Sequence, residues 1–411
     1  MKSSNLSSDA VVERRPNAVP LGVRKYLALD DFQARARRFL PKAIYGYIAG
    51  GAETDQSLDA NRAAFRQFAF APRVLRDVQS RDHRRRLFGI DYDVPFGIAP
   101  MGFSALAALN GDVILARGAA AAGSLAICSA ASLTPLERVA KQAGSRWFQA
   151  YLSGDETRIR AMVNRILTAG FDTLVITADV PVAANRENNA RNGFDTPFRL
   201  SPSLIWQGVT HPRWSLGTLG GQLVRHGMPQ FENFDAIPGP PLFSRKLARS
   251  LSARDKLSWS HIALIRDIWP GKLVVKGLLT SDDANEARQC GVDGIIVSNH
   301  GGRQLDGAIS PLEVLAQIKN SAAEMTVMYD SGIRRGTDVL KALALGADFV
   351  FVGRPFLFAA AVAGLPGVTR AMALLREEID RDMALLGIRQ LSDLSPDLLR
   401  QQNRMAMPHT Y

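Results

Sequence analysis

The chain has 411 residues, of which 46% are apolar, and a formal net charge of +11. This length allows one large α/β domain with an insertion, or two ordinary domains, with a sizeable core in either case. A basic surface favours an anionic substrate, acidic lipid or nucleic acid, and charge alone does not choose among them.

The cysteines and histidines argue against a disulfide framework and a metal site. Only Cys128 and Cys290 occur, each among apolar neighbours, and the six histidines lack ligand spacing. Residues 1–20 are polar and have no apolar stretch of signal-peptide length, and no run of about 18 apolar residues suggests a membrane-spanning helix. We therefore expect a cytoplasmic protein in a reducing compartment, with residues 1–28 as a flexible N-terminal segment.

A helical preamble precedes the main part of the domain. From Asp30 to Phe70, apolar residues recur at helical spacing, with breaks at Pro41 and at Gly50-Gly51. We place the folded domain at residues 29–385 and a C-terminal tail at residues 386–411.

Short apolar runs then alternate with helical segments, which indicates βα units and a parallel sheet. A glycine and an aspartate two residues later precede three of these runs, at Gly170, Gly291 and Gly346, which suggests a repeated unit. Eight such units predict a (β/α)8 TIM barrel with its chemistry at the carboxyl ends of the strands; an open, doubly wound sheet is the alternative. The runs are residues 96–99, 125–127, 147–148, 174–176, 273–275, 295–297, 326–329 and 349–352.

An insertion at residues 199–258 interrupts the pattern after the fourth strand. It holds eight Lys and Arg residues against three Asp and Glu residues, among many apolar ones. We expect Trp206 and Trp214 to be its apolar anchors. A basic loop with aromatic residues at the mouth of a barrel is either a lid over the substrate or a peripheral membrane anchor.

Polar residues at the predicted strand ends suit the oxidation of a 2-hydroxy acid. An imidazole beside a carboxylate is oriented and has a raised pKa, which suits a general base. Two guanidiniums suit a carboxylate, and phenols can hold a neighbouring hydroxyl. These candidates are His300, Asp179, Arg186, Arg303, Tyr151 and Tyr47.

The last two strand ends predict a phosphate site. The sequence from Asp330 to Gly336 and the Gly353-Arg354 pair combine glycine amides with arginine, where barrels commonly bind phosphate. With Lys276 close to the barrel axis, this pattern fits flavin mononucleotide (FMN), whose ring the lysine would stabilise when reduced. No GxGxxG sequence indicates a nicotinamide fold.

From about Leu29 to Leu365, the chain resembles the FMN-dependent 2-hydroxy acid oxidoreductases, among them glycolate oxidase, L-lactate dehydrogenase and mandelate dehydrogenase. The stretch from Ser298 to Asp306 looks like the signature of the family. The segments 45–53, 147–151 and 330–336 support the resemblance.

The resemblance implies a role for each candidate residue. His300 would be the base and Asp179 its partner, Arg303 and Arg186 would bind the carboxylate, Tyr151 would contact the substrate hydroxyl, and Tyr47 would assist. FMN would contact Pro100, Gly102, Ser129, Gln149, Thr177, Lys276, Ser298, Asp330, Gly332, Arg334, Gly353 and Arg354.

Three residues bear on the substrate and the electron acceptor. Gly102 resembles the mandelate and L-lactate dehydrogenases, which pass electrons to a quinone, whereas oxidases of the family usually have alanine there. Ala130 and Ala183 replace bulkier residues of glycolate oxidase and predict room for a larger side chain. Segments 210–214 and 258–262 resemble the L-lactate branch, so a mandelate-like acid and lactate both stay open.

We expect an L-2-hydroxy acid to be oxidised to the 2-oxo acid by a hydride or a carbanion route, with electrons passed to a quinone-type acceptor. An oxidase that reduces O2 to H2O2 is the alternative. A homotetramer is expected, and the inner face of the cytoplasmic membrane is an alternative location. An FMN-using isomerase such as type 2 isopentenyl diphosphate isomerase would have no use for the carboxylate site, and a nucleic-acid-binding module would leave the polar strand ends unused.

Overall fold

An eight-stranded parallel sheet, closed into a barrel, forms the centre of the molecule. The computed structural model describes residues 20–144, 146–194, 201–242 and 254–402. The strands follow the order β4-β11-β10-β9-β8-β7-β6-β5, and a parallel bridge between Ile98 and Ala126 joins the two ends. This arrangement confirms the predicted (β/α)8 barrel. Its strands are β4 (Phe96–Ile98), β5 (Ile127–Ser129), β6 (Trp147–Ala150), β7 (Thr173–Thr177), β8 (Lys272–Leu278), β9 (Gly294–Val297), β10 (Thr326–Asp330) and β11 (Phe349–Val352).

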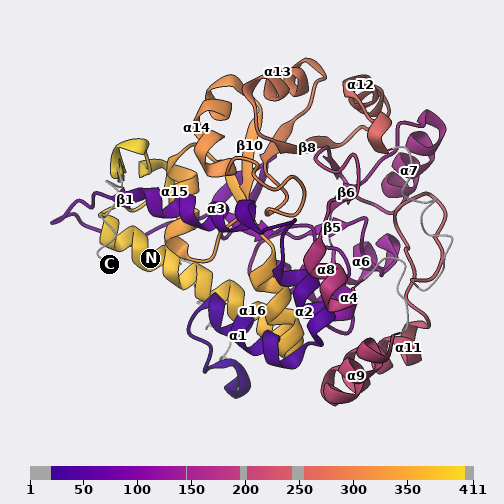
Figure 1. The fold of residues 1–411 in the computed structure, drawn as a ribbon. Helices are drawn as coiled ribbons and strands as arrows, with labels where there is room; N and C mark the ends of the chain where they lie inside the picture. Colours follow the sequence, from indigo (N-terminus) through magenta and orange to yellow (C-terminus); the bar gives the residue numbers. More distant parts are fainter. Residues whose placement is uncertain (1–19, 145, 195–200, 243–253, 403–411) are drawn as a thin grey trace, which may run out of the picture.

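Helices connect the strands and surround the barrel (Figure 1). In this view α14, α13, α12 and α7 follow one another along the outer edge. Each predicted apolar run is a strand, with ends shifted by a few residues. The helices are α4 (Ser104–Ala107), α5 (Gly111–Ala121), α6 (Leu136–Ala143), α7 (Glu156–Thr168), α12 (Trp259–Ile268), α13 (Ser281–Gln289), α14 (Pro311–Ser321), α15 (Gly336–Ala344) and α16 (Arg354–Leu386).

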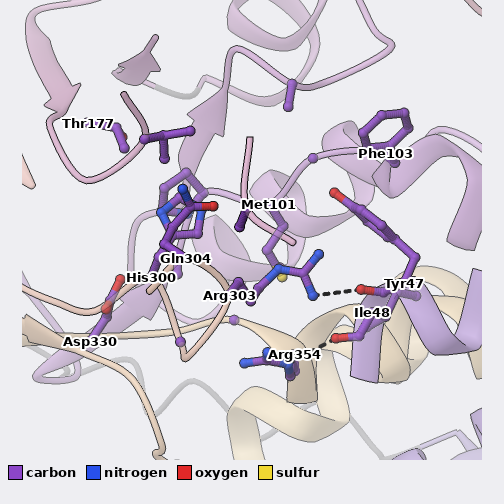
Figure 2. Close-up of a pocket in the computed structure, with 18 of the residues that line it drawn as sticks. Tyr47, Ile48, Met101, Phe103, Thr177, His300, Arg303, Gln304, Asp330 and Arg354 are labelled. Atoms are coloured by element: carbon purple, nitrogen blue, oxygen red, sulfur yellow. Dashed lines mark hydrogen bonds between the residues drawn. The ribbon is translucent and has the colours of Figure 1, made fainter. Parts of the chain in front are cut away.

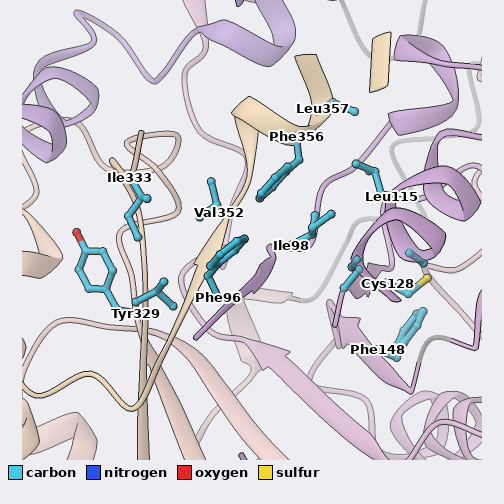
Figure 3. Packing of buried hydrophobic residues seen from close by; sticks show 14 of the residues in the cluster. Phe96, Ile98, Leu115, Cys128, Phe148, Tyr329, Ile333, Val352, Phe356 and Leu357 are labelled. Atoms are coloured by element: carbon cyan, nitrogen blue, oxygen red, sulfur yellow. The ribbon is translucent and has the colours of Figure 1, made fainter. Parts of the chain in front are cut away.

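The barrel sheet separates two apolar cores, because successive side chains of a strand point to opposite faces. Val175, Val274 and Ile296 fill the inside, together with Leu87 of the hairpin formed by β2 (Arg85–Leu87) and β3 (Ile90–Tyr92). The outer face packs against the helices. Figure 3 shows part of this outer core, in which the rings of Phe96 and Phe356 stack with centroids 6.3 Å apart.

The preamble and the C-terminal segment meet beside the barrel. The preamble contains η1 (Leu21–Val23), α1 (Leu29–Phe39), α2 (Lys42–Ala49), α3 (Gln56–Ala64) and η2 (Phe65–Gln67). The helical expectation is wrong for its last three residues, because β1 (Phe68–Phe70) pairs antiparallel with β12 (Leu399–Gln401). Before β12, the predicted tail forms η6 (Leu391–Asp393) and η7 (Pro396–Leu398).

Part of the segment predicted to be flexible is packed. Of residues 1–28, residues 1–19 lie outside the described residues. Val23 and Tyr26 are buried, and the Tyr26 ring stacks on Phe32 of α1 at 4.3 Å. Burial of these two apolar side chains holds residues 20–28 against the domain.

Helix α16 corrects the expectation that no helix is long and apolar enough to cross a membrane. Within the described residues it is the one helix that meets this test. However, Ala363 and Gly364 depart from helical geometry, Pro366 follows, and just over half of the apolar window is buried. The helix packs against α1 and α5. The break and the burial are those of a core helix.

The described part of the insertion, residues 201–242 and 254–258, is mostly helical and projects from the barrel near α9 and α11 (Figure 1). After α8 (Glu187–Asn192), it contains α9 (Pro202–Thr210), α10 (Pro212–Trp214), the π-helix η3 (Ser215–Gly220), α11 (Gly221–His226) and η5 (Arg254–Lys256). Trp214 is buried, and its indole N–H donates to the Leu106 carbonyl oxygen at 2.7 Å. Trp206 is 68% exposed, so the expectation that it anchors the insertion to the core is wrong.

Candidate active site

The loop after β9 holds three successive residues in the left-handed region of backbone space. The φ angle is 58° at His300, 67° at Gly301 and 72° at Gly302. A non-glycine residue there is strained and persists where its surroundings impose the conformation. The His300 amide donates to Ser298 Oγ at 3.0 Å, and the Gly302 amide donates to Asn299 Oδ1 at 3.2 Å. The turn therefore fixes the direction of the His300 side chain.

His300 and Asp179 form a partly buried pair that joins the loops after β9 and β7. His300 Nδ1 lies 2.8 Å from Asp179 Oδ1, and Nε2 lies 3.5 Å from Tyr151 Oη. Burial opposes ionisation of Asp179, but His300 and Lys276 together lower the pKa of its carboxyl below the ordinary value. An ionised carboxylate can only accept a hydrogen bond, so Nδ1 carries the hydrogen and Nε2 presents a lone pair toward Tyr151.

Burial determines the protonation of the His300 imidazole and of the neighbouring Tyr151 phenol. The raised pKa that the sequence predicts for His300 is wrong. Burial lowers the pKa of His300 below the ordinary value, although Asp179 acts in the opposite direction. It also raises the pKa of Tyr151 to about 12. At neutral pH the imidazole is therefore an unprotonated base and the phenol keeps its hydrogen.

Two partly buried guanidiniums hold the preamble against the barrel (Figure 2). Arg303 donates to the carbonyl oxygens of Tyr47 and Gly50 at 2.6 and 2.8 Å, and its guanidinium carbon lies 4.7 Å from the centre of the Tyr47 ring. Arg354 donates to the carbonyl oxygens of Ile48 and Gly50 at 2.9 and 3.0 Å. Burial lowers the pKa of Arg303 to about 10 and that of Arg354 well below its ordinary value.

Arg186 adds a third cation from the loop after β7. Its Nε donates to the Arg303 carbonyl oxygen at 3.1 Å, and its guanidinium also donates to Gln304 Oε1 at 2.9 Å. Within the described residues, no carboxylate forms an ion pair with Arg186, Arg303 or Arg354. Buried positive charge without a carboxylate partner favours the binding of an anion. The three arginines therefore suit a substrate carboxylate and a phosphate.

Lys276 lies at the end of β8. Its Nζ donates to Ser298 Oγ at 2.7 Å and pairs with Asp330 Oδ2 at 3.2 Å. Burial opposes the charge, but Asp330 and then Asp179 raise the pKa of the ammonium above its ordinary value. The lysine is therefore a permanent cation near the barrel axis.

Buried polar atoms without hydrogen-bond partners indicate where a cofactor fits. Among the described residues, Gln149 Nε2, Thr177 Oγ1 and Arg334 Nε are buried and have no hydrogen-bond partner, although Arg334 Nε lies 3.8 Å from Asp30 Oδ1, and all three residues line one cavity of about 550 Å³. A flat ring with polar edges would provide partners for the first two, and a phosphate would provide one for the third. The residues present therefore fit FMN.

Most of the predicted site residues line this cavity. Asp179, Ser129 and Ser298 do not, but each hydrogen-bonds to a residue that does, as Ser129 Oγ does with Gln149 Oε1 at 3.0 Å. The predicted residues that line the cavity are Tyr47, Pro100, Gly102, Gln149, Tyr151, Thr177, Arg186, Lys276, His300, Arg303, Asp330, Gly332, Arg334, Gly353 and Arg354.

The two alanines predicted to enlarge the pocket differ in position. Ala183 lines the cavity, whereas Ala130 packs into the outer core and Ala131 lines the cavity instead. The prediction for Ala130 is wrong because side chains alternate along β5. Ile127 faces the inside of the barrel, so Cys128 and Ala130 share the opposite face.

An aromatic wall and a further arginine also line the cavity, and none of these residues was predicted from the sequence as part of the site. Phe103 follows β4 and Phe194 follows α8, while Phe231, Phe234 and Arg254 belong to the insertion. No spacing in the sequence relates these residues. For Phe231 and Phe234, the apolar composition of the insertion was the only signal in the sequence, and it was equally consistent with a lid and with a membrane anchor.

We predict that Gly302→Ala lowers the melting temperature more than Gly307→Ala does. Both glycines have positive φ, 72° and 79°, so each alanine carries a similar backbone strain of about 1–2 kcal/mol. A Cβ at Gly302 would lie 2.4 Å from the backbone nitrogen of Leu58, whereas at Gly307 the nearest atom is 3.9 Å away. Thermal unfolding followed by circular dichroism checks the difference, and equal shifts would contradict the importance of this close approach.

Comparison with known proteins places these observations in context. Residues 36–401 match the family profile described as FMN-dependent dehydrogenase. The chain is 40% identical to (S)-mandelate dehydrogenase of Pseudomonas putida over 375 residues, which cover 91% of this chain and 94% of that protein. It is 36% identical to L-lactate dehydrogenase of Pectobacterium atrosepticum over 379 residues, which cover 91% and 97%.

Solved structures show the same similarity. The structure of the monotopic membrane protein (S)-mandelate dehydrogenase superposes with a TM-score of 0.86 at 39% identity, covering 92% of this chain and all of that one. A mandelate oxidase structure superposes with a TM-score of 0.76 at 33% identity, covering 92% and 98%.

Proposed function

The chain belongs to the family of FMN-dependent dehydrogenases that oxidise 2-hydroxy acids, and we propose that its substrate is a mandelate-like L-2-hydroxy acid. The observation that carries this proposal is the position of the His300–Asp179 pair. The His300 side chain lines the cavity, which partly buried arginines and an aromatic wall also line. The arginines suit the carboxylate, and the wall suits an aryl or branched side chain. The similarity to (S)-mandelate dehydrogenase supports the same substrate class.

Two groups of residues would hold FMN. When bound, FMN would accept the two electrons that the substrate loses. We assign the ring to the strand-end residues with polar side chains and to the loop after β4, and the ribityl and phosphate to the loops after β10 and β11. The first group is Pro100, Gly102, Ser129, Gln149, Thr177, Lys276 and Ser298; the second is Asp330, Gly332, Arg334, Gly353 and Arg354.

In the proposed mechanism, Nε2 of His300 takes one proton from the substrate. The proton comes from the hydroxyl if the hydrogen on Cα leaves as hydride, and from Cα in a carbanion route. Either way, Asp179 stabilises the imidazolium through Nδ1. Arg186 and Arg303 hold the carboxylate, and the Tyr151 phenol, beside Nε2, holds the substrate oxygen.

Tyr47 would assist Arg303 in holding the carboxylate. The Arg303 guanidinium stacks on the Tyr47 ring and donates to the backbone carbonyl oxygen of Tyr47. These contacts limit the motion of both side chains. A substrate bound in this way has its carboxylate at one side of the imidazole and its side chain toward the aromatic wall.

We predict that His300→Ala slows FMN reduction by a 2-hydroxy acid by about 10²- to 10⁴-fold, because it removes the base. The measurement is anaerobic loss of the oxidised flavin spectrum with mandelate, lactate, glycolate and longer 2-hydroxy acids. The bound flavin spectrum of the variant controls for folding. Reduction by none of these acids in the parent enzyme would contradict the proposed function, and unchanged reduction in the variant would contradict the role of His300.

We predict that kcat/KM falls on the acid side of a pKa below about 6.5, the ordinary value for histidine, because burial lowers the pKa of His300. Asp179→Asn removes an interaction that raises this pKa, so the acid limb should move to lower pH while the plateau falls by about 100-fold. A pH series of FMN reduction rates checks both changes. A limb that moves to higher pH would contradict the assigned coupling.

A quinone-type molecule is the proposed electron acceptor. Gly102 lines the cavity, and its glycine resembles the dehydrogenases that use a quinone. A Cβ at this position would lie 2.6 Å from Ala131 Cβ and 3.3 Å from the Tyr47 hydroxyl, so the packing around it has adapted to the absence of a side chain.

We predict that the reduced enzyme is reoxidised faster by a soluble ubiquinone analogue than by air-saturated buffer. Stopped-flow recovery of the oxidised flavin spectrum, with peroxide measured in parallel, checks the acceptor. Rapid formation of one peroxide per turnover would identify the alternative, a 2-hydroxy acid oxidase.

The insertion is the proposed membrane contact. Five large apolar side chains on α9, η3 and α11 are mostly exposed, Val224 by 88%. Arg213 lies on α10 and Arg225 on α11, and their charges add attraction to acidic lipid. A protein described as monotopic is among the structural relatives, and quinones dissolve in lipid. The apolar side chains are Ile205, Trp206, Val209, Leu216 and Val224.

We predict that the double variant Trp206→Glu, Val224→Glu loses sedimentation with vesicles that contain phosphatidylglycerol, because two charges enter the proposed apolar contact. The matched control is Leu385→Glu, which alters a side chain that is 67% exposed on α16, outside the insertion. Equal binding of the double variant and the parent would contradict the proposed membrane contact.

The homotetramer stays a prediction, which light scattering of the purified enzyme checks.

A further inference from the structure

Arg254 is a partly buried cation of the cavity that the proposed mechanism does not use. Its guanidinium carbon lies 4.7 Å from the centre of the Tyr151 ring and 5.0 Å from the centre of the Phe234 ring. Burial lowers the pKa of Arg254 below its ordinary value. The faces of Tyr151 and Phe234 therefore hold this guanidinium at one end of the aromatic wall.

Neighbouring arginines show how differently Arg254 is placed. Arg158 pairs with Asp235 at 2.7 Å, and Arg165 pairs with Glu137, also at 2.7 Å. Among the described residues, the Arg254 guanidinium forms neither an ion pair nor a hydrogen bond, and it contacts the two rings. Stacking leaves the N–H groups at the edge of a guanidinium available to donate in its plane. A partly buried donor group of this kind favours an acceptor from a ligand.

The aromatic wall leads from one cation to the other. Ring centroids lie 5.1 Å apart between Tyr47 and Phe103, 5.6 Å between Phe103 and Phe231, and 5.2 Å between Phe231 and Phe234. Phe234 then lies 6.1 Å from Tyr151. Arg303 stacks on the first ring of this series and Arg254 on the last.

This order has a consequence for the shape of the substrate. In the proposed binding mode, Arg303 holds the carboxylate at the Tyr47 end, and the side chain extends along the wall. Its far end then meets Phe234, the ring that carries Arg254. An apolar wall with a cation at each end suits an aryl group with an acceptor on the side away from the carboxylate.

We propose that Arg254 is a specificity-determining residue that binds a carboxylate or phenolic oxygen at the far end of the substrate side chain. The preferred substrates would then be ring-substituted aryl 2-hydroxy acids, with 4-carboxymandelate as the strongest case. This inference rests on the proposed function, because it assumes that a 2-hydroxy acid binds with its carboxylate at Arg303.

The test compares anaerobic FMN reduction by mandelate, 4-methylmandelate, 4-hydroxymandelate and 4-carboxymandelate. Arg254→Met removes the charge and keeps similar length. It should lower kcat/KM for 4-carboxymandelate by about 10- to 100-fold, the range for a hydrogen bond to a charged group, and change it less than about threefold for mandelate and 4-methylmandelate. Arg254→Lys should restore part of the loss, because it keeps a positive charge.

Arg158→Met is the matched control, since it removes a nearby cation that already has a carboxylate partner. It should affect all four substrates alike. An equal loss for all four substrates in Arg254→Met would overturn the proposal and assign Arg254 to the support of Tyr151. A loss confined to reoxidation by a quinone would overturn it in favour of an acceptor site. If mandelate does not reduce the FMN of the parent enzyme, this result contradicts the proposed function, and it does so independently of any Arg254 variant.

Discussion

The hydrogen bond between His300 Nδ1 and Asp179 Oδ1, 2.8 Å long and partly buried, is the interaction around which the site is arranged. It joins the ends of β7 and β9 and leaves one imidazole nitrogen directed toward Tyr151. The left-handed turn at Gly301 and Gly302 makes this direction possible, because an ordinary loop would not place the side chain there. The chemistry therefore depends on a local backbone strain that the surrounding barrel maintains.

Partly buried positive charge in the cavity is the second constraint. Arg186, Arg303 and Arg354 have backbone carbonyls or an amide as hydrogen-bond acceptors, and no carboxylate among the described residues neutralises them. Lys276, by contrast, is paired with Asp330. Such an arrangement is unfavourable in an empty site and favourable once a substrate carboxylate and a phosphate are bound. The fold thus keeps unneutralised charge where its anionic ligands are expected to bind.

The insertion connects the two proposed halves of the reaction. Its inner residues, Phe231, Phe234 and Arg254, complete the wall of the cavity. Its outer helices carry exposed apolar side chains such as Val224. Lid and membrane anchor were alternatives at the level of composition, but one segment can serve as both because its two faces differ. This arrangement would bring the flavin site close to lipid, where a quinone dissolves.

The sequence alone was enough for the eight strands, the barrel and the residues at the strand ends, because strand periodicity and polar strand ends are local patterns that topology brings together. The strand β1 and the exposure of Trp206 were not predictable, since both depend on which surfaces are covered by distant parts of the chain. The same holds for the aromatic wall and for Arg254, which come from segments with no common spacing. Local pattern therefore determined the reaction class, and only the tertiary structure decided the shape and charge of the pocket, because long-range packing sets which side chains face the cavity.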